Sequence, residues 1–410
     1  MDTSAHHPLP AEPMSHNGEA EDDEDDGEGG GEEDQAGNPY RPPGNERDGE
    51  RATFAHNIPR NFIVPDRLRD RPYELIEAAN DWHFAMMNDY PRNVFYREAL
   101  RHVIKPDSYV LEIGAGSGLL SIIAASLGAR VVVAIEANRH LASVAREIIR
   151  RNGFEDRVHI INKMSTDVAP EEILHYGTPT VLLSEILGTL LLGESALHYV
   201  MDARQRLTPG AAVVPRRGSQ FATLIESPDI ASITSVKGWE GIDLAWFNTL
   251  QDTTSMVFTK QYGFRFSSCT YRELAPKTSV LDLDFAADAV GKWRAEQRQK
   301  IVAVSSGTIH AIMASWEVYD GALDAAAPLT MSTHPSDTLH NFPRDMQWGQ
   351  GLQLIEDLEG ASEGLAPKPF VVTAGEELIL VTRFSNDGVT VQFQLEREGA
   401  PMSGVTVGLA

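Results

Sequence analysis

Short apolar runs alternate with amphipathic segments between residues 109 and 183, and this pattern predicts parallel strands separated by helices. Helices are expected at Leu119–Leu127, ahead of Gly128, and at Arg139–Arg150. The fully apolar runs are typical of central strands buried on both faces, and they lie at Tyr109–Ile113, Val131–Ile135, Val158–Ile161 and Thr180–Leu183. The alternation predicts a doubly wound, Rossmann-like α/β domain.

A helical pattern precedes this domain. From Tyr73 to Asn88, apolar positions recur at spacings of three and four residues, which predicts one face of a helix. Pro91 is expected to interrupt it, and Asn93–Val103 is a second helix candidate.

After Pro209-Gly210 the pattern changes to short, partly alternating runs separated by Gly and Pro, which predicts an antiparallel sheet or barrel. Residues 229–262 look partly helical and are interpreted as an arm inserted into it. The expected strands are Phe221–Ile225, Val280–Phe285, Thr308–Trp316, Leu378–Phe384 and Val389–Gln394. The predicted organisation is therefore an α/β domain with its preceding helices at 53–215 and an antiparallel β-barrel at 216–410.

The charge is concentrated at the N-terminus. The chain of 410 residues has a net charge of -24, of which residues 1–50 carry 16 acidic and 2 basic side chains. Such a segment buries too little apolar surface to fold, so residues 1–52 are expected to be a disordered acidic tail. It either solvates the protein or attracts basic substrates. The acidic balance disfavours binding to nucleic acid or to an anionic membrane and favours cationic peptides or proteins as partners.

Cys269 is the single cysteine, so the sequence offers no intrachain disulfide and no Cys-His metal cluster. No metal is expected. The longest apolar stretches, such as Leu119–Leu127, are about half the length of a transmembrane helix. No signal peptide is recognisable, and a reducing, cytoplasmic location is expected, with the nucleus as an open alternative.

A glycine-rich turn follows the first strand of the α/β domain. Gly114, Gly116 and Gly118 are spaced G-x-G-x-G, tighter than the pattern that binds a dinucleotide pyrophosphate. Glu136 ends the next strand, where a carboxylate can accept hydrogen bonds from both ribose hydroxyls. A plain strand–helix turn would also contain glycines, but the acidic partner favours an adenosine ligand with a short amino-acid tail. Arg92 is the candidate cation for that tail's carboxylate.

Two glutamates follow the last apolar strand. Glu185 comes directly after it, and Glu194 follows nine residues later, beyond an apolar run bracketed by Gly188 and Gly193. A looped hairpin would bring both carboxylates to one site, where they would bind a shared cation. A guanidinium suits them best because its donors form a flat fork. The alternative is an amphipathic helix with two surface glutamates.

With these motifs in place, the sequence from about residue 73 onward resembles the protein arginine methyltransferases. Each motif alone is weak, but the ordered set is specific. The motifs are Met86-Met87-Asn88-Asp89-Tyr90-Pro91-Arg92-Asn93, Glu112–Gly118, Ser184-Glu185 through Glu194, and Gln347-Trp348-Gly349-Gln350. The segments 162–166 and 191–197 are most similar to the type III class, which makes only omega-N-monomethylarginine.

The resemblance implies S-adenosylmethionine as cofactor, S-adenosylhomocysteine as product, and arginine in basic proteins or peptides as substrate. It also implies that the arm dimerises, and since this chain has one module where many type III enzymes have two, a homodimer is expected. The residues implied for cofactor binding are His83, Met86, Arg92, Gly114, Gly116, Gly118, Glu136, Met164 and Ser165.

For the substrate, the resemblance implies that Glu185 and Glu194 clamp the guanidinium and that Met86 packs beside the reacting nitrogen, with Gln347 and Trp348 nearby. Asp89 or Glu194 would accept the proton. Most members have His before this Trp, whereas Gln347 can orient groups only by hydrogen bonding. Three alternatives stay open: a dimethylating enzyme, a methyltransferase for small molecules or nucleic acid, and a catalytically silent scaffold.

Overall fold

The computed structural model describes residues 62–72, 74–78, 81–250, 260–291, 296–321, 328–337, 348–355 and 368–397. The chain divides into two compact units, residues 1–51 and 52–410, and all described residues belong to the second. The predicted acidic tail, Tyr73 and Gln347 lie outside the described residues.

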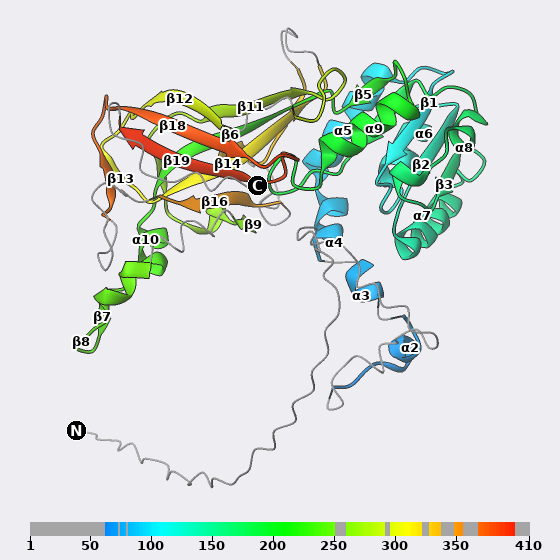
Figure 1. Ribbon diagram of the computed structural model, residues 1–410. Helices are drawn as coiled ribbons and strands as arrows, with labels where there is room; N and C mark the ends of the chain where they lie inside the picture. The colour runs from blue at the N-terminus through cyan, green and yellow to red at the C-terminus, as the bar shows by residue number, and fades with distance from the viewer. Residues whose placement is uncertain are drawn as a thin grey trace, which may run out of the picture. The chain divides into compact units, whose positions relative to one another are not determined.

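A five-stranded parallel sheet forms the first part of this unit (Figure 1). Its order is β3-β2-β1-β4-β5, and each neighbouring pair is parallel. Strands β1, β2 and β4 are buried along their whole length, as their continuous apolar sequences require. The strands are β1 Tyr109–Ile113, β2 Val131–Ile135, β3 Val158–Ile161, β4 Val181–Ser184 and β5 Ala212–Val214.

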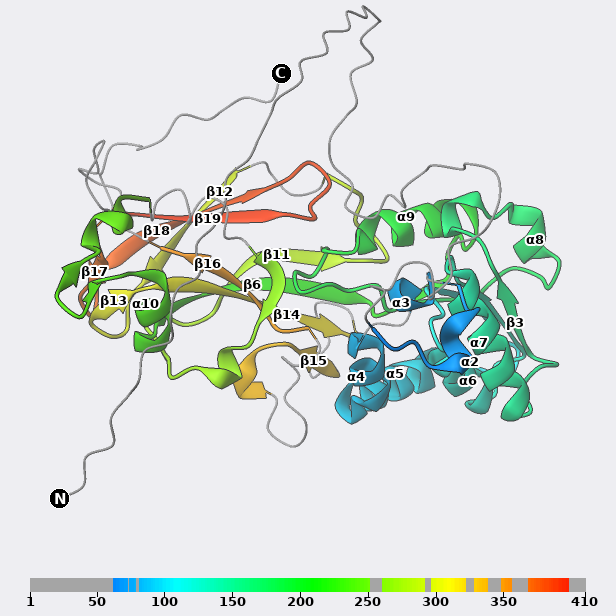
Figure 2. The same ribbon diagram turned by 90° about the horizontal axis from the view of Figure 1, so that it is seen from below.

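Helices cover both faces of the sheet, with α5, α6 and α7 on one side and α8 and α9 on the other (Figure 2). The amphipathic α7 buries Ala142, Ala145 and Ile149. The helices are α5 Tyr90–Val103, α6 Leu119–Ser126, α7 Arg139–Arg151, α8 Pro170–Leu174 and α9 Ala196–Arg206, with the 3₁₀ helix η1 at Ser165–Asp167.

Three short helices precede α5: α2 Asp66–Arg69, α3 Leu75–Ala78 and α4 Asp81–Asn88. The sequence predicted that Pro91 would interrupt the chain between two helices, the second beginning at Asn93. Instead, Pro91 lies in the first turn of α5. Proline fits there because its missing N–H would have no partner in the helix. The side chain of Asp89 caps α5 by accepting a hydrogen bond from the Arg92 amide at 2.9 Å.

The second half of the chain is antiparallel. Its main sheet has the order β10-β6-β14-β16-β9, with β11 paired to β6 and β15 paired to β14. Two smaller groups, β12-β18-β19 and β13-β17, complete it. The longest strands are β6 Arg217–Glu226 and β14 Ala311–Tyr319. The others are β9 Lys260–Phe264, β10 Arg272–Glu273, β11 Thr278–Asp284, β12 Glu296–Val302, β13 Gly307–Ile309, β15 Thr330–Ser332, β16 Gln350–Leu354, β17 Phe370–Val372, β18 Glu377–Phe384 and β19 Val391–Arg397, with 3₁₀ turns η3 Phe266–Ser268 and η4 Pro335–Asp337.

The expected arm leaves the sheet after β6. Its described part contains α10 Pro228–Thr234, a hairpin of β7 Gly238–Trp239 and β8 Ile242–Asp243, and the 3₁₀ helix η2 Ala245–Leu250. The arm exposes several large apolar side chains. Exposed ones include Ile233, Trp239, Ile242, Trp246, Phe247 and Leu250. The predicted fold class, an α/β domain followed by an antiparallel domain with an inserted arm, is thus confirmed.

Candidate active site

The site forms at the carboxyl ends of three adjacent parallel strands. In the register of the sheet, Ile113 at the end of β1 pairs with Ile135 of β2 and with Ser184 of β4. Gly114, Glu136 and Glu185 therefore leave the sheet at the same edge. Strand β1 is where the order of the sheet reverses, the place where ligands of open α/β sheets bind.

The glycine-rich turn needs its glycines. Gly114, Gly116 and Gly118 all have positive φ, at 75°, 53° and 78°. A Cβ on Gly114 would lie 2.8 Å from Cγ2 of Ile186, while no heavy atom lies within 4 Å of a Cβ built on Gly116. The turn is therefore tight at its start and open at Gly116, which leaves backbone accessible to a ligand.

Glu136 is held rigidly beside this turn. Its Oε2 accepts from the Gly116 amide and its Oε1 from the Asn138 amide, both at 2.8 Å. Burial raises the pKa of the Glu136 carboxyl, and the backbone hydrogen bonds act in the opposite direction. The Asn162 side chain donates to the Glu136 carbonyl at 2.7 Å, which ties the end of β3 to the same place.

The residues expected near an adenine follow β3. Ser165 is buried in the first turn of η1, and its carbonyl accepts from Nη2 of Arg206 at 3.1 Å. Met164 precedes it and is 40% exposed. An exposed thioether beside a fixed turn provides an apolar surface for a flat ring.

Arg92 and Glu185 form a buried ion pair. The sequence assigned them to two different ligands, but Nε of Arg92 donates to Oε2 of Glu185 at 3.1 Å, and Nη2 contacts the same oxygen. Burial disfavours the charged guanidinium, yet the negative charge of Glu185 holds the pKa of Arg92 above its ordinary value. The two predicted subsites therefore meet at one contact.

Glu194 lies at the far side of the same loop and feels the charge of Glu185. Glu194 is exposed to solvent, but the protein atoms around its carboxyl group displace part of the water that would hydrate it. This desolvation, together with the Glu185 charge, raises the pKa of Glu194 to about 8. The loop is a compact hairpin, since a Cβ on Gly188 would lie 3.0 Å from Cα of Gly193.

Trp348 supports the hairpin from the antiparallel domain. It is buried, and its Nε1 donates to the Leu187 carbonyl at 3.0 Å. The Thr189 hydroxyl donates to the Trp348 carbonyl at 2.8 Å. Trp348 is thus hydrogen-bonded to the hairpin at Leu187 and at Thr189.

The remaining predicted residues lie on α4 and at the start of α5. His83 and Met86 are half-buried, and burial lowers the pKa of His83. Asp89 is 5% exposed and caps α5, so one of its oxygens already holds the helix that carries Arg92.

Two residues close to this edge were not predicted. Glu112 in β1 is fully buried, accepts from the Ser121 hydroxyl, and has its pKa raised to about 8 by burial. Tyr96 lies one turn after Arg92, whose guanidinium is 5.6 Å from its ring, and its hydroxyl donates to the Ser184 carbonyl at 3.2 Å. A charged residue within a buried strand, and the i, i+4 spacing on α5, were the available signals.

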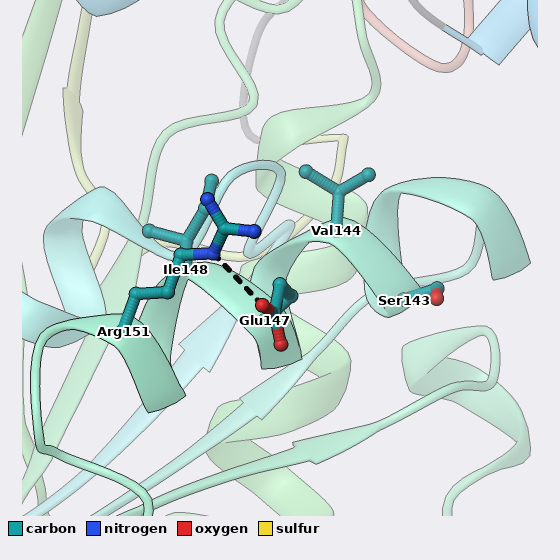
Figure 3. Close-up of a pocket in the computed structure, with 5 residues that line it drawn as sticks. All are labelled: Ser143, Val144, Glu147, Ile148 and Arg151. Atoms are coloured by element: carbon teal, nitrogen blue, oxygen red, sulfur yellow. Dashed lines mark hydrogen bonds and ion pairs between the residues drawn. The ribbon is translucent and has the colours of Figure 1, made fainter.

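A surface hollow elsewhere contains none of the predicted residues. It lies on α7 and is lined by Ser143, Val144, Glu147, Ile148 and Arg151 (Figure 3). Within the described ranges, no group of three His, Cys, Asp or Glu side chains is arranged to hold a metal ion. Within the same ranges, no helix is both long and apolar enough to cross a membrane.

The α/β domain matches a methyltransferase family model. The model for ribosomal protein L11 methyltransferase (PrmA) matches residues 96–211, which include the glycine-rich turn, Glu136 and both loop glutamates. Fold and site thus define a methyltransferase domain of the Rossmann-like class.

Sequence relatives show which family of methyltransferases the chain belongs to. An arginine N(omega)-methyltransferase of Streptomyces achromogenes subsp. streptozoticus is 32% identical over 301 residues, 73% of this chain and 74% of that protein. Protein arginine N-methyltransferase 7 of Drosophila ananassae is 29% identical over 273 residues, 63% of this chain but only 39% of that protein. The chain belongs to the protein arginine methyltransferase family, as the resemblance predicted.

Solved structures share the fold. PRMT1 of Trypanosoma brucei, in an enzyme-prozyme heterotetrameric complex with AdoHcy, has a TM-score of 0.62 at 22% identity, covering 79% of this chain and 95% of that one. Protein arginine methyltransferase 10 of Arabidopsis thaliana has a TM-score of 0.58 at 20% identity, covering 79% and 96%.

Proposed function

We propose that this protein transfers one methyl group from S-adenosylmethionine to a guanidinium nitrogen of arginine in a protein or peptide, and stops at monomethylarginine. The observation that carries the proposal is the hairpin that presents Glu185 and Glu194 at the strand edge beside the glycine-rich turn. The PRMT7 relatives match less than half of their own length, so the limit of one methyl rests on motif similarity.

The residues at the strand edge fit the cofactor. Glu136 is aimed by two backbone amides and can accept from ribose hydroxyls, and the backbone at Gly116 has open space beside it. Arg92 would hold the amino-acid carboxylate, Met164 and Ser165 would flank the adenine, and His83 would lie on the cofactor side. When bound, S-adenosylmethionine supplies an electrophilic methyl on a sulfonium sulfur.

The glutamates would hold the substrate. Both bonds from Arg92 go to one oxygen of Glu185, Oε2, so the other oxygen would accept from the substrate guanidinium. Glu194 would contact a second nitrogen. Together they draw positive charge toward the nitrogens that do not react, which leaves electron density on the one that does. Met86 would pack beside that nitrogen, and Gln347 would orient the substrate by hydrogen bonding.

Glu194 is the better of the two candidate proton acceptors. A raised pKa makes its carboxylate a stronger base near neutral pH, while one oxygen of Asp89 is engaged in capping α5. Removal of the proton from the attacking nitrogen completes the transfer.

A second candidate substrate is free arginine. The Streptomyces relative, which matches over 74% of its own length, is named an arginine N(omega)-methyltransferase, without reference to a protein. The guanidinium clamp would serve either substrate, because it recognises only the end of the side chain.

One experiment tests both substrates. The protein is incubated with labelled S-adenosylmethionine and either an Arg-Gly-rich peptide or free L-arginine, and the hydrolysed products are separated. We expect monomethylarginine from the peptide and no dimethylarginine. Label on free arginine alone would establish the second candidate, dimethylarginine would refute the limit of one methyl, and no transfer would refute the function.

We also propose a homodimer formed through the arm. The described arm exposes Trp246 and Phe247 at 73% and 68%, which is unusual for aromatic side chains that lack a partner surface. A double Trp246→Glu and Phe247→Glu variant should sediment as a monomer, whereas the wild type sediments as a dimer. A monomeric wild type would refute the proposal.

A further inference from the structure

One cross-strand pair of the antiparallel sheet is hydrogen-bonded to the glutamate hairpin. Gln220 of β6 and Trp316 of β14 are direct partners in the register, so their side chains share a face. Oε1 of Gln220 accepts from the Leu191 amide at 2.8 Å, and Nε1 of Trp316 donates to the Gly188 carbonyl at 2.9 Å. The two backbone groups that they hold, at Gly188 and Leu191, lie between Glu185 and Glu194 in the chain.

Both anchors are themselves fixed. Gln220 is 2% exposed, and its amide nitrogen donates to the Ser315 carbonyl on the neighbouring strand at 2.7 Å. Trp316 is fully buried and packs edge-to-face on Trp348 at 5.0 Å between ring centroids. A buried side-chain amide whose oxygen and nitrogen are both hydrogen-bonded has one orientation. Gln220 therefore fixes the position of the hairpin relative to the sheet.

The sheet under the hairpin is shaped to receive it. A Cβ on Gly218 would lie 2.9 Å from Cδ2 of Leu191, and one on Gly351 would lie 3.0 Å from Cδ2 of Leu190. The two leucines are 1% and 3% exposed. Apolar burial therefore keeps the hairpin against the sheet, and the two polar anchors define its register there.

We propose that Gln220 and Trp316 are positioning residues for catalysis, because they hold Glu185 and Glu194 at the spacing needed to grip the guanidinium. This inference rests on the proposed function. A displacement of about 1 Å at a reacting group lowers turnover by as much as a hundredfold. The hairpin itself adds few constraints, such as the bond from the Gly193 amide to the Leu190 carbonyl at 2.8 Å.

The test compares two buried glutamines. Gln220→Met keeps the length of the side chain but removes both hydrogen bonds. Gln353→Met is the matched control, since Gln353 of β16 is 6% exposed and also bonds one backbone amide and one carbonyl, those of Phe393. Both variants should lower the melting temperature by similar amounts. Trp316→Phe is a second test, which removes a single N–H donor and keeps an aromatic ring.

The readouts separate positioning from stability. For Gln220→Met we expect kcat on an arginine peptide to fall at least tenfold, with the Kd of S-adenosylhomocysteine within twofold of wild type. Trp316→Phe should reduce kcat in the same direction, and Gln353→Met should keep kcat within twofold. If kcat decreased in proportion to the loss of melting temperature in all three variants, the anchors would be merely structural and the inference would be wrong. Should Gln220→Met not fold, Trp316→Phe decides alone. A wild type without methyl transfer to peptide or free arginine would refute the proposed function instead.

Discussion

The buried pair of Arg92 and Glu185 makes a quantitative prediction about stability. Their side chains are 8% and 4% exposed, and the guanidinium contacts a single carboxylate oxygen through two nitrogens. The perturbation is a double-mutant cycle, with Arg92→Met, Glu185→Gln and the two together. Methionine keeps much of the apolar stem of Arg92, and glutamine keeps the shape of Glu185.

The magnitude follows from burial. Unit charges about 4 Å apart attract by about 4 kcal/mol at the effective dielectric constant of a protein site. Removing one partner of a buried pair costs about 3–5 kcal/mol because the other charge stays buried alone. The double variant leaves neither charge unpaired, so its loss should be smaller than the sum of the single losses. We expect a coupling free energy of about 2–3 kcal/mol.

Urea denaturation of the four proteins measures these free energies of unfolding, provided that they share one m value. An exposed pair serves as the control: Nη2 of Arg69 lies 2.9 Å from Oδ1 of Asp66, with side chains 60% and 93% exposed. The cycle of Arg69→Met and Asp66→Asn should give a coupling of about 0.5 kcal/mol or less. A coupling at Arg92 and Glu185 no larger than this control would refute the reasoning from burial.

Three further predictions concern protonation and the glycine turn. Glu194 has a pKa raised to about 8, and a guanidinium binds its ionised form, so the affinity for an arginine peptide should rise with pH. Because water reaches the side chain, the affinity should rise by between about twofold and tenfold from pH 7 to pH 9. Calorimetry measures this affinity, and the Glu194→Gln variant should show no such rise. The pKa of Glu112 is raised to about 8, so its stabilising contribution is present at low pH and is lost as pH rises through 8. Between pH 5 and pH 8, the free energy of unfolding of Glu112→Gln should therefore increase relative to wild type by about 1.4 kcal/mol per pH unit, measured by urea titration. Parallel pH curves for the two proteins would contradict this prediction. Gly114→Ala should melt well below Gly116→Ala, since both have positive φ but only the first Cβ meets Ile186, at 2.8 Å; equal melting temperatures would show that the contact relaxes freely.

The sequence predicted the parallel sheet closely because burial on both faces leaves an unambiguous pattern. The predicted Tyr109–Ile113 and Val131–Ile135 are the observed β1 and β2. By contrast, β12 at Glu296–Val302 was not predicted, since its sequence is mostly charged and polar and alternates only weakly. Pro91 was misjudged because a proline in the first turn of a helix resembles a break.

The site was predicted as a set of residues but not as a set of contacts. The positions of Gly114, Glu136 and Glu185 at strand ends follow from local sequence alone. The pair of Arg92 and Glu185 could not be predicted, because it joins residues 93 positions apart and depends on how α5 packs at the end of β4. The roles of Gln220 and Trp316 could not be predicted either, because their hydrogen bonds also join distant parts of the chain. Within a strand sequence, a buried glutamine cannot be distinguished from a solvent-facing one.

The two loop glutamates are unequal, and this inequality connects the two halves of the proposed reaction. Glu185 faces a guanidinium that the protein itself supplies, whereas Glu194 faces the negative charge of Glu185. If Arg92 holds the cofactor carboxylate as proposed, that carboxylate would compete with Glu185 for the same donors, and each contact it gained would weaken the internal pair. In the proposed reaction, Glu185 would then become available to the substrate guanidinium, whose positive charge would in turn favour the ionised form of Glu194. Binding free energies are reciprocal, so the substrate would strengthen cofactor binding by the same factor. A single buried ion pair would therefore couple the occupation of the two proposed subsites, without any movement of the sheet that carries them.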